Sequence, residues 1–224
     1  MTFSIVARTP AAQYFGIAIA SSSPAVAARC AHARAGVGAV ATQNITDPRL
    51  GPNMLERLSH GAAAQVALHE ALGATPFAAY RQVLAVSAHG PPVIHSGVHA
   101  LGVVGSAIGA DAAAAGNLLA SSDVPASMIA AFEAAGGQLA DRLLRALQAG
   151  ADRGGEAGPI HSAGILVVRE VTWPIVDLRV DWTDGNPVAE LAAIWKIYAP
   201  QIDAYVQRAL DPARAPGFGV PGDP

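Results

Sequence analysis

Thr2 is the residue whose chemistry is easiest to define from the sequence alone. Loss of the initiator methionine from "MTFSIVARTP" leaves Thr2 with a free α-amino group next to its hydroxyl. An α-amine has a pKa of about 7.7–8.0, so it can take the hydroxyl proton near neutral pH and make the threonine a nucleophile. An ordinary first strand beginning at Thr2 is the alternative, and the residue by itself leaves both interpretations open.

Other polar residues are candidates for supporting such a nucleophile. Ser4 shares a strand face with Thr2, because side chains alternate along a strand, and its hydroxyl is a candidate for binding the nucleophile or its amine. A strand serine packed at a sheet edge is the alternative. Cleavage of an amide also needs hydrogen-bond donors for the oxyanion, and the candidates are Asn117, Gln43 and Asn44. Turn chemistry or strand-end capping explains these three amides equally well.

A further group of residues concerns substrate binding. Ser21 ends the expected second strand beside the first, so its hydroxyl is a candidate for lining the mouth of a site. Arg34 and Arg81 are candidate anchors for a substrate carboxylate. Asp177 alternates with Arg179 on one strand face, where a charged row can hold an amine or a carboxylate. Structural ion pairs or solvated surface are the alternative for each charged residue.

Two rival chemistries use the cysteine and the histidines. Cys30 lies two residues before His32, but that spacing does not define a catalytic pair, and a buried inert cysteine is the simpler interpretation. His95, His99 and His161 are a candidate zinc site, although "HSGVH" is typical of a loop or strand and its four-residue spacing suits a helix. We therefore expect no metal. No GxGxxG follows a strand and no P-loop is present, so we expect no nucleotide cofactor, and the proposed chemistry implies no other cofactor.

The composition limits the class of protein. We expect the 224 residues to form a single domain over 1–210, followed by a loose Pro- and Gly-rich tail over 211–224. Charged residues are 14% of the chain against a usual ~25%, which favours buried layers and a homo-oligomer. The net charge of −3 without a basic cluster argues against nucleic acid and anionic membranes, and favours a small-molecule substrate. One cysteine and no long apolar stretch predict a cytoplasmic protein without a membrane span.

The expected elements alternate between groups of strands and groups of helices. Runs at 3–8 and 14–21 predict an N-terminal hairpin, and a Gly-rich third strand is expected at 35–43. The remaining expectations are helices around 54–58 and 66–72, strands within 80–97, weak strand or loop at 100–120, helices from 123 and 139, strands at 161–171 and 175–182, and a final helix that Asn186 and Pro187 begin. This order is typical of an α+β fold with antiparallel sheets.

Several sequence blocks resemble a known family when they are taken in order. They are "MTFSIVAR", "ARAGVGAVATQ", "YRQ", "GNLLA", "LADRLLRALQAG", "HSAGILVV" and "VDLRVD". The chain is similar over about residues 2–195 to the bacterial domain-of-unknown-function family ten-twenty-eight, which is grouped with the N-terminal nucleophile (Ntn) hydrolases. Several blocks in a fixed order are more specific than any single motif.

The resemblance implies a four-layer αββα sandwich of two antiparallel sheets, with an active site at one end and Thr2 as the nucleophile. The sequence departs from the family pattern at Ala115, where the family usually has Gln, at 159–161 before Ser162, and in the central loop. We therefore expect an amidohydrolase that acts on a small amide, N-acyl amino acid or short peptide through an acyl-enzyme. The alternative is a non-catalytic small-molecule binder or oligomeric partner protein on the same scaffold, with Met1 retained.

Overall fold

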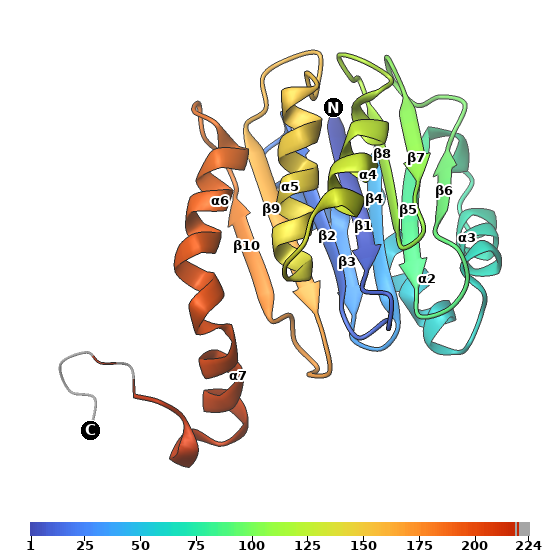
Figure 1. Cartoon of the computed structure of the whole chain (residues 1–224). Coiled ribbons are helices and arrows are strands. Elements are labelled where there is room, and N and C mark those ends of the chain that lie inside the picture. Colours follow the sequence, from blue (N-terminus) through green and yellow to red (C-terminus); the bar gives the residue numbers. More distant parts are fainter. Residues whose placement is uncertain (218, 220–224) are drawn as a thin grey trace.

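Two antiparallel sheets form the centre of the protein in the computed structural model, which describes residues 1–217 and 219. The six-stranded sheet has the order β10 (Val176–Val180), β9 (Ser162–Val168), β2 (Phe15–Ser21), β1 (Thr2–Arg8), β8 (Ala112–Asn117) and β7 (Gly105–Ile108). The four-stranded sheet has the order β3 (Ala31–Arg34), β4 (Gly38–Asn44), β5 (Arg81–Ser87) and β6 (Val93–Ser96). Strands β1 and β2 of one sheet pack on β4 of the other (Figure 1).

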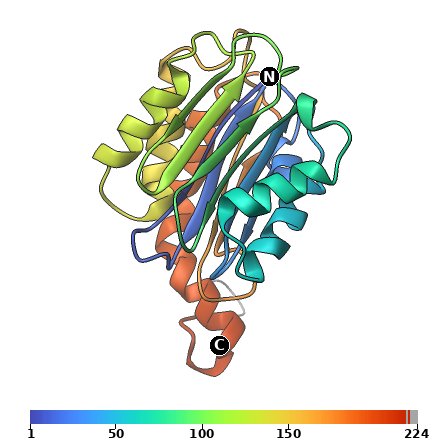
Figure 2. The same ribbon diagram turned by 90° about the vertical axis from the view of Figure 1, so that its right-hand side faces the viewer.

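Helices cover the outer face of each sheet, so the layers run helix, sheet, sheet, helix (Figure 2). The six-stranded sheet carries α4 (Val124–Ala134), α5 (Leu139–Asp152) and α6 (Pro187–Tyr198), and the four-stranded sheet carries α2 (Leu50–Ser59) and α3 (Ala64–Gly73). The remaining helical elements are α1 (Val26–Cys30), α7 (Ile202–Leu210) and the 3₁₀ turns η1 (Ala78–Tyr80), η2 (Ala199–Gln201) and η3 (Pro212–Arg214). The predicted combination of antiparallel sheets with helices is confirmed.

Strand alternation divides the core into three apolar clusters. Phe3 and Ile5 of β1 point to α4 and α5, whereas Val6 of the same strand points to the space between the sheets. Val40 of β4 packs with Met54 of α2 in the third cluster. Because the chain alternates in this way, Thr2 and Ser4 fall on the inner face with Val6.

Two segments differ from the sequence-based expectations. Residues 100–120 were expected to form weak strand or loop, but residues 112–117 form β8, which pairs with β1 on one side and β7 on the other. Alanine has a low intrinsic strand preference, and pairing on both edges with burial on both faces overrides it. Residues 26–34 form α1 and β3, which were not predicted, and the strand expected at 35–43 is β4 (Gly38–Asn44).

The start of the last long helix agrees with the prediction from the sequence. Asn186 caps α6 as predicted, because its side chain accepts hydrogen bonds from Val188 N and Ala189 N at 3.1 and 3.0 Å. Within the expected tail at 211–224, residues 211–217 contain η3, and residues 218 and 220–224 lie outside the described part. Among the described residues, no helix combines the length and apolarity needed to cross a membrane.

Candidate functional site

The space between the two sheets changes from apolar to polar along the strands. Val6, Phe15 and Ile17 fill it at one end. At the end where Thr2 lies, the buried inner-face residues are polar: Thr2, Ser4, Ser21, Gln43, Gln82, Asn117 and Ser162. The register pairs Thr2 with Asn117 and Ser21 with Ser162, so the ends of β1, β2, β8 and β9 meet there. We call this group the N-terminal polar cluster.

Two hydroxyls lie together at the start of the chain. Thr2 Oγ1 is 3.3 Å from Ser21 Oγ, and both hydroxyls donate to the carbonyl oxygen of Met1. Ser21 Oγ also accepts a hydrogen bond from Ser23 N at 3.1 Å. The hydroxyl of Thr2 is therefore buried next to a second hydroxyl, and both use the same backbone acceptor.

Side-chain amides connect the two sheets behind these hydroxyls. Ser4 Oγ donates to Gln43 Oε1 at 2.6 Å. Its hydroxyl therefore binds Gln43, whereas the sequence had suggested a contact with Thr2. Gln43 Nε2 donates to Gln82 Oε1 at 2.7 Å and to Ala115 O at 3.1 Å. Asn117 Nδ2 also donates to Gln82 Oε1, at 3.1 Å. Gln43 Nε2 therefore uses both of its N–H donors, whereas Asn117 Nδ2 uses one of its two among the described residues and can still offer the other to an oxyanion.

The carbonyl oxygen of the Asn117 side chain, unlike its amide nitrogen, is not hydrogen-bonded to a described residue. Asn117 is fully buried, and its Oδ1 has no hydrogen-bond partner among the described residues. A buried polar atom without a partner costs about 1–3 kcal/mol, so a strand residue of this kind indicates a donor that comes from elsewhere. Asn117 and Thr2 are register partners on one strand face, and this acceptor therefore lies next to the start of the chain.

Glu156 places a carboxyl group beside the same cluster. It is 3% exposed, and Ser22 N donates to its two oxygens at 3.1 and 3.0 Å. Burial raises the pKa of Glu156 to about 7, although the positive chain terminus and the Ser22 hydrogen bond act to lower it. A carboxyl group that titrates near neutral pH and senses the terminal amine is a common feature of functional sites.

Of the other predicted substrate-binding residues, Asn44 and Arg81 adjoin the cluster residues Gln43 and Gln82, whereas Arg34 and Asp177 lie elsewhere. Asn44 follows Gln43, and its amide binds loop backbone atoms. Arg81 begins β5 and donates to a backbone carbonyl of the loop after β4. Arg34 lies at the far end of β3 and pairs with Glu56 at 2.9 Å. Asp177 is exposed on the edge strand β10. The structure therefore brings neither Arg34 nor Asp177 to the N-terminal polar cluster.

The rival cysteine and histidine chemistries find no geometric support. Burial raises the pKa of the Cys30 thiol and lowers the pKa of His32, so both groups favour their neutral forms. His95 contacts a backbone carbonyl at 3.0 Å, His99 packs on a tyrosine, and His161 stacks on a tryptophan with ring centroids 4.2 Å apart. In the part of the chain that the structure describes, no three His, Cys, Asp or Glu side chains gather where they could hold a metal.

Sequence reasoning missed three members of this end of the molecule. Gln82 lies two residues before Leu84 on β5, and the alternation of that strand was a signal for its inner position. Ser162 Oγ donates to Ser23 O at 2.6 Å and closes the end of β2. Glu156 lies in a Gly-rich loop without any periodicity, so the sequence held no signal for its burial beside the chain start.

The fold and the cluster together define a layered α+β protein with buried hydroxyls, amides and a carboxyl group at its N-terminus. The chain belongs to the family described as "Family of unknown function (DUF1028)", whose model matches residues 2–191. The chain is also similar to protein SPO2555 from Silicibacter pomeroyi, a crystal structure of the same family. The identity is 28%, the TM-score is 0.82, and the match covers 90% of this chain and 93% of that one.

A weaker likeness and one negative result complete the comparisons. Anbu (ancestral beta-subunit) from Yersinia bercovieri is 11% identical with a TM-score of 0.38, and the match covers 97% of this chain and 100% of that one. No curated protein matches the chain.

Proposed function

We propose that this chain is an N-terminal nucleophile hydrolase with a four-layer αββα sandwich, in which Thr2 cleaves an amide bond after Met1 is lost. The observation that carries the proposal is the contact of two buried hydroxyls, those of Thr2 and Ser21, with the single carbonyl oxygen of Met1. The resemblance of the family to Ntn hydrolases supports the same class.

Loss of Met1 changes the chemistry of this end in two ways. Thr2 gains a free α-amine beside its hydroxyl, which supplies a nucleophile and a base on one residue. The Thr2 and Ser21 hydroxyls also lose the acceptor that they share in the unprocessed chain. A substrate carbonyl that takes the place of the Met1 carbonyl restores this acceptor and puts a carbonyl carbon next to Thr2 Oγ1.

The reaction then follows from these groups. The amine takes the proton of Thr2 Oγ1 as that oxygen bonds to the carbonyl carbon, and the Ser21 hydroxyl donates to the developing oxyanion. The protonated amine gives its proton to the leaving nitrogen as the C–N bond breaks, which leaves an ester on Thr2. Water, deprotonated by the same amine, attacks this ester and releases the acid. General-base work of this kind typically contributes about 10²- to 10⁴-fold.

Two further groups are suited to hold the free amine. Asn117 Oδ1 is the buried acceptor without a partner, and a free amine has more N–H donors than the acylated nitrogen of the unprocessed chain. Glu156 supplies a buried carboxyl group whose pKa the Met1 amine of the unprocessed chain acts to lower, which indicates that it lies near the start of the chain. We assign both as positioning residues, because they act on the amine and not on the substrate.

A small amide, an N-acyl amino acid or a short peptide is the substrate class that fits a site lined by hydroxyls and amides. The second candidate function is a non-catalytic small-molecule binder or oligomeric partner protein that keeps Met1. The occupied hydroxyls favour it, because the Met1 carbonyl then satisfies both donors permanently. The cytoplasmic location and the homo-oligomer stay predictions.

The test is a screen of untagged protein against small amides, N-acyl amino acids and dipeptides, with release of the primary amine as the signal. Thr2→Ala is expected to lower kcat/KM by about 10³-fold or more, whereas Thr2→Ser keeps a hydroxyl and retains measurable turnover. Thr172→Ala, at an exposed threonine, is the matched control and is expected to leave the rate unchanged. Normal turnover by Thr2→Ala would sink the proposal, and saturable binding without turnover by a chain that keeps Met1 would support the second candidate.

A further inference from the structure

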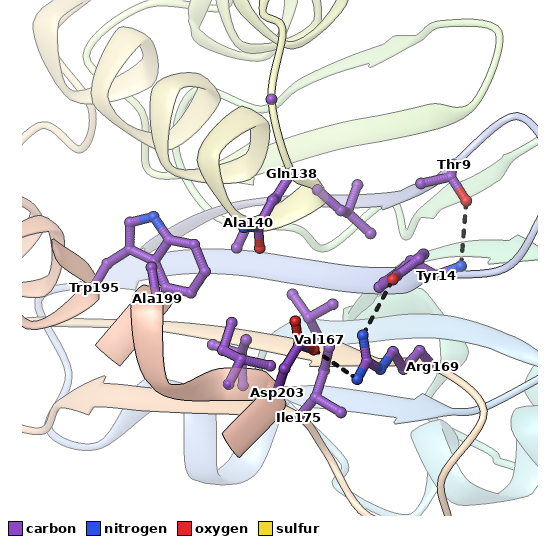
Figure 3. A pocket seen from close by; sticks show the side chains of 14 residues that line it. Thr9, Tyr14, Gln138, Ala140, Val167, Arg169, Ile175, Trp195, Ala199 and Asp203 are labelled. Atoms are coloured by element: carbon purple, nitrogen blue, oxygen red, sulfur yellow. Dashed lines mark hydrogen bonds and ion pairs between the residues drawn. The ribbon is translucent and has the colours of Figure 1, made fainter. Parts of the chain in front are cut away.

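A cavity of about 360 Å³ lies beside the turn from β1 to β2, at the opposite end of β1 from Thr2. Figure 3 shows the side chains that line it. Thr9 and Tyr14, from the turn between β1 and β2, form one side of it. The start of α5, the end of β9, the start of β10, and the junction of α6 with α7 form the rest. Ligand pockets usually measure roughly 300–1,000 Å³, so this volume suits one small molecule and not a peptide.

One part of the cavity wall is apolar. Leu139, Val167, Ile175, Trp195 and Ile202 contribute buried side chains from four different elements and one loop. The indole N–H of Trp195 is not available to a ligand, because Nε1 donates to Asp141 Oδ1 at 2.8 Å. This wall therefore favours an aliphatic or aromatic group.

Arg169 supplies positive charge to the other part of the wall. Its side chain is 16% exposed, and its Nη1 and Nη2 donate to Tyr14 Oη at 3.3 Å and to Asp203 Oδ1 at 2.9 Å. Its Nε is buried without a hydrogen bond, although a Glu170 oxygen lies 3.1 Å away. Arg169 Nη1 and Nη2 each carry a second N–H besides the one used in these contacts, and these two N–H groups can take a carboxylate through two parallel hydrogen bonds.

Asp203 supplies the opposite charge. It lies in the first turn of α7, and its side chain is 87% exposed. An ion pair with so exposed a carboxylate is worth about 0–1 kcal/mol, so Asp203 can separate from Arg169 at little cost. Arg169 and Asp203 are the charged residues among those that line the cavity, and they face each other in Figure 3.

We infer that this cavity binds a free α-amino acid with an apolar side chain, whose carboxylate pairs with Arg169 and whose ammonium pairs with Asp203. A simple anion would leave Asp203 as an unfavourable neighbour, and a simple cation would do the same with Arg169. A zwitterion satisfies both charges, and its side chain covers the apolar wall beneath Trp195.

The bound amino acid connects two parts of the chain. Arg169 follows β9 inside the segment that matches the family, whereas Trp195, Ile202 and Asp203 belong to residues beyond 191. The ligand therefore fastens the start of α7 to the sheet. Binding at this end is independent of Thr2, and the Thr2→Ala protein is expected to bind in the same way.

The experiment is isothermal titration calorimetry of the full chain with L-leucine and L-phenylalanine. We expect saturable binding with a dissociation constant of about 1 mM or tighter. Leucinamide, which lacks the carboxylate, is expected to bind about tenfold or more weakly than leucine. The acid 4-methylpentanoate, which lacks the amine, is expected to bind about three- to fivefold more weakly, because Asp203 is well exposed.

Variants assign these effects to the two charged residues. Arg169→Gln is expected to weaken leucine binding about tenfold or more, and Asp203→Asn about three- to fivefold, with circular dichroism to verify that each variant is folded. Arg57→Gln, at an exposed ion pair on α2, is the matched control and keeps the affinity of the natural chain. Absence of saturable heat with both amino acids would overturn the inference, and so would equal affinity for leucine and leucinamide or an unchanged affinity in Arg169→Gln.

Discussion

The two ends of the six-stranded sheet hold polar groups in opposite ways. At the Thr2 end, the polar side chains are fully buried and bind one another across the two sheets, from Ser4 through Gln43 and Gln82 to Asn117. At the Arg169 end, a cavity remains, and its ion pair joins a mostly buried guanidinium to an exposed carboxylate.

The difference between the two ends suits one for catalysis and the other for reversible ligand binding. A buried network in which nearly every donor has an acceptor fixes its side chains before any substrate arrives, which is what catalysis requires. A cavity with a weak, replaceable ion pair can exchange that pair for a ligand at little cost. Substitutions should therefore affect the stability of the protein strongly at the Thr2 end and weakly at the Arg169 end.

Gln43→Leu gives the largest expected change in stability. The substitution leaves Ser4 Oγ without its acceptor and removes the bonds from Gln43 to Gln82 Oε1 and Ala115 O, and we expect a loss of about 2–4 kcal/mol in the free energy of unfolding. Urea denaturation measures it. Gln65→Leu, at an exposed position of α3, is the control and should change the stability by less than about 0.5 kcal/mol. A loss below about 1 kcal/mol for Gln43→Leu would contradict the view that the buried network at the Thr2 end stabilises the protein strongly.

Glu156→Gln tests the cost of a buried charge at the same end. The pKa of Glu156 is raised in the folded protein to about 7 from 4.5, so the folded state binds more protons than the unfolded state between these values. The contribution of Glu156 to stability is therefore fully present below about pH 4.5 and is lost as the pH rises through about 7. We expect Glu156→Gln to be more stable than the natural chain by about 2–3 kcal/mol at pH 8, with a smaller difference at pH 5.

Denaturation curves at the two pH values measure this effect. Glu133→Gln, on the partly exposed side of α4, serves as the control and is expected to give no comparable pH dependence. An equal difference between Glu156→Gln and the natural chain at pH 5 and pH 8 would contradict the buried charge.

Asp203→Asn gives the smallest expected change. Its carboxylate is 87% exposed, so loss of the pair with Arg169 should reduce the free energy of unfolding by about 0.5 kcal/mol or less in the absence of ligand. Thermal denaturation with and without leucine sharpens the comparison, because only the leucine-induced stabilisation should fall. A loss above about 2 kcal/mol without leucine would mean that the ion pair is structural.

Much of the fold was predictable because strand alternation and helix periodicity are local signals. The N-terminal hairpin, the shared strand face of Thr2 and Ser4, and the Asn186 cap all followed from neighbouring residues. Strand β8 did not, because a run of alanines becomes a central strand only through its partners β1 and β7. Local sequence does not contain that information.

The candidate site was predictable only where it lies on strands. Thr2, Ser21 and Asn117 each begin or end a strand and Gln43 is the second-to-last residue of β4, so these four residues lie at the same end of the layered sheets. Glu156 comes from a loop, and its burial depends on the return of that loop to the chain start. Arg34 and Asp177 were suggested by charge alone, and charge does not determine which end of a strand a residue occupies.

The central claim is that Thr2 carries a free amine and acts as the nucleophile. The most direct measurement is the intact mass of untagged protein. The mass is measured for the protein alone, and again after a brief reaction with an amide substrate that it hydrolyses has been stopped with acid. We predict a chain that lacks one methionine, and after quenching an added acyl mass that is absent from Thr2→Ala. A chain that keeps Met1, or an acyl mass that persists in Thr2→Ala, would contradict the account.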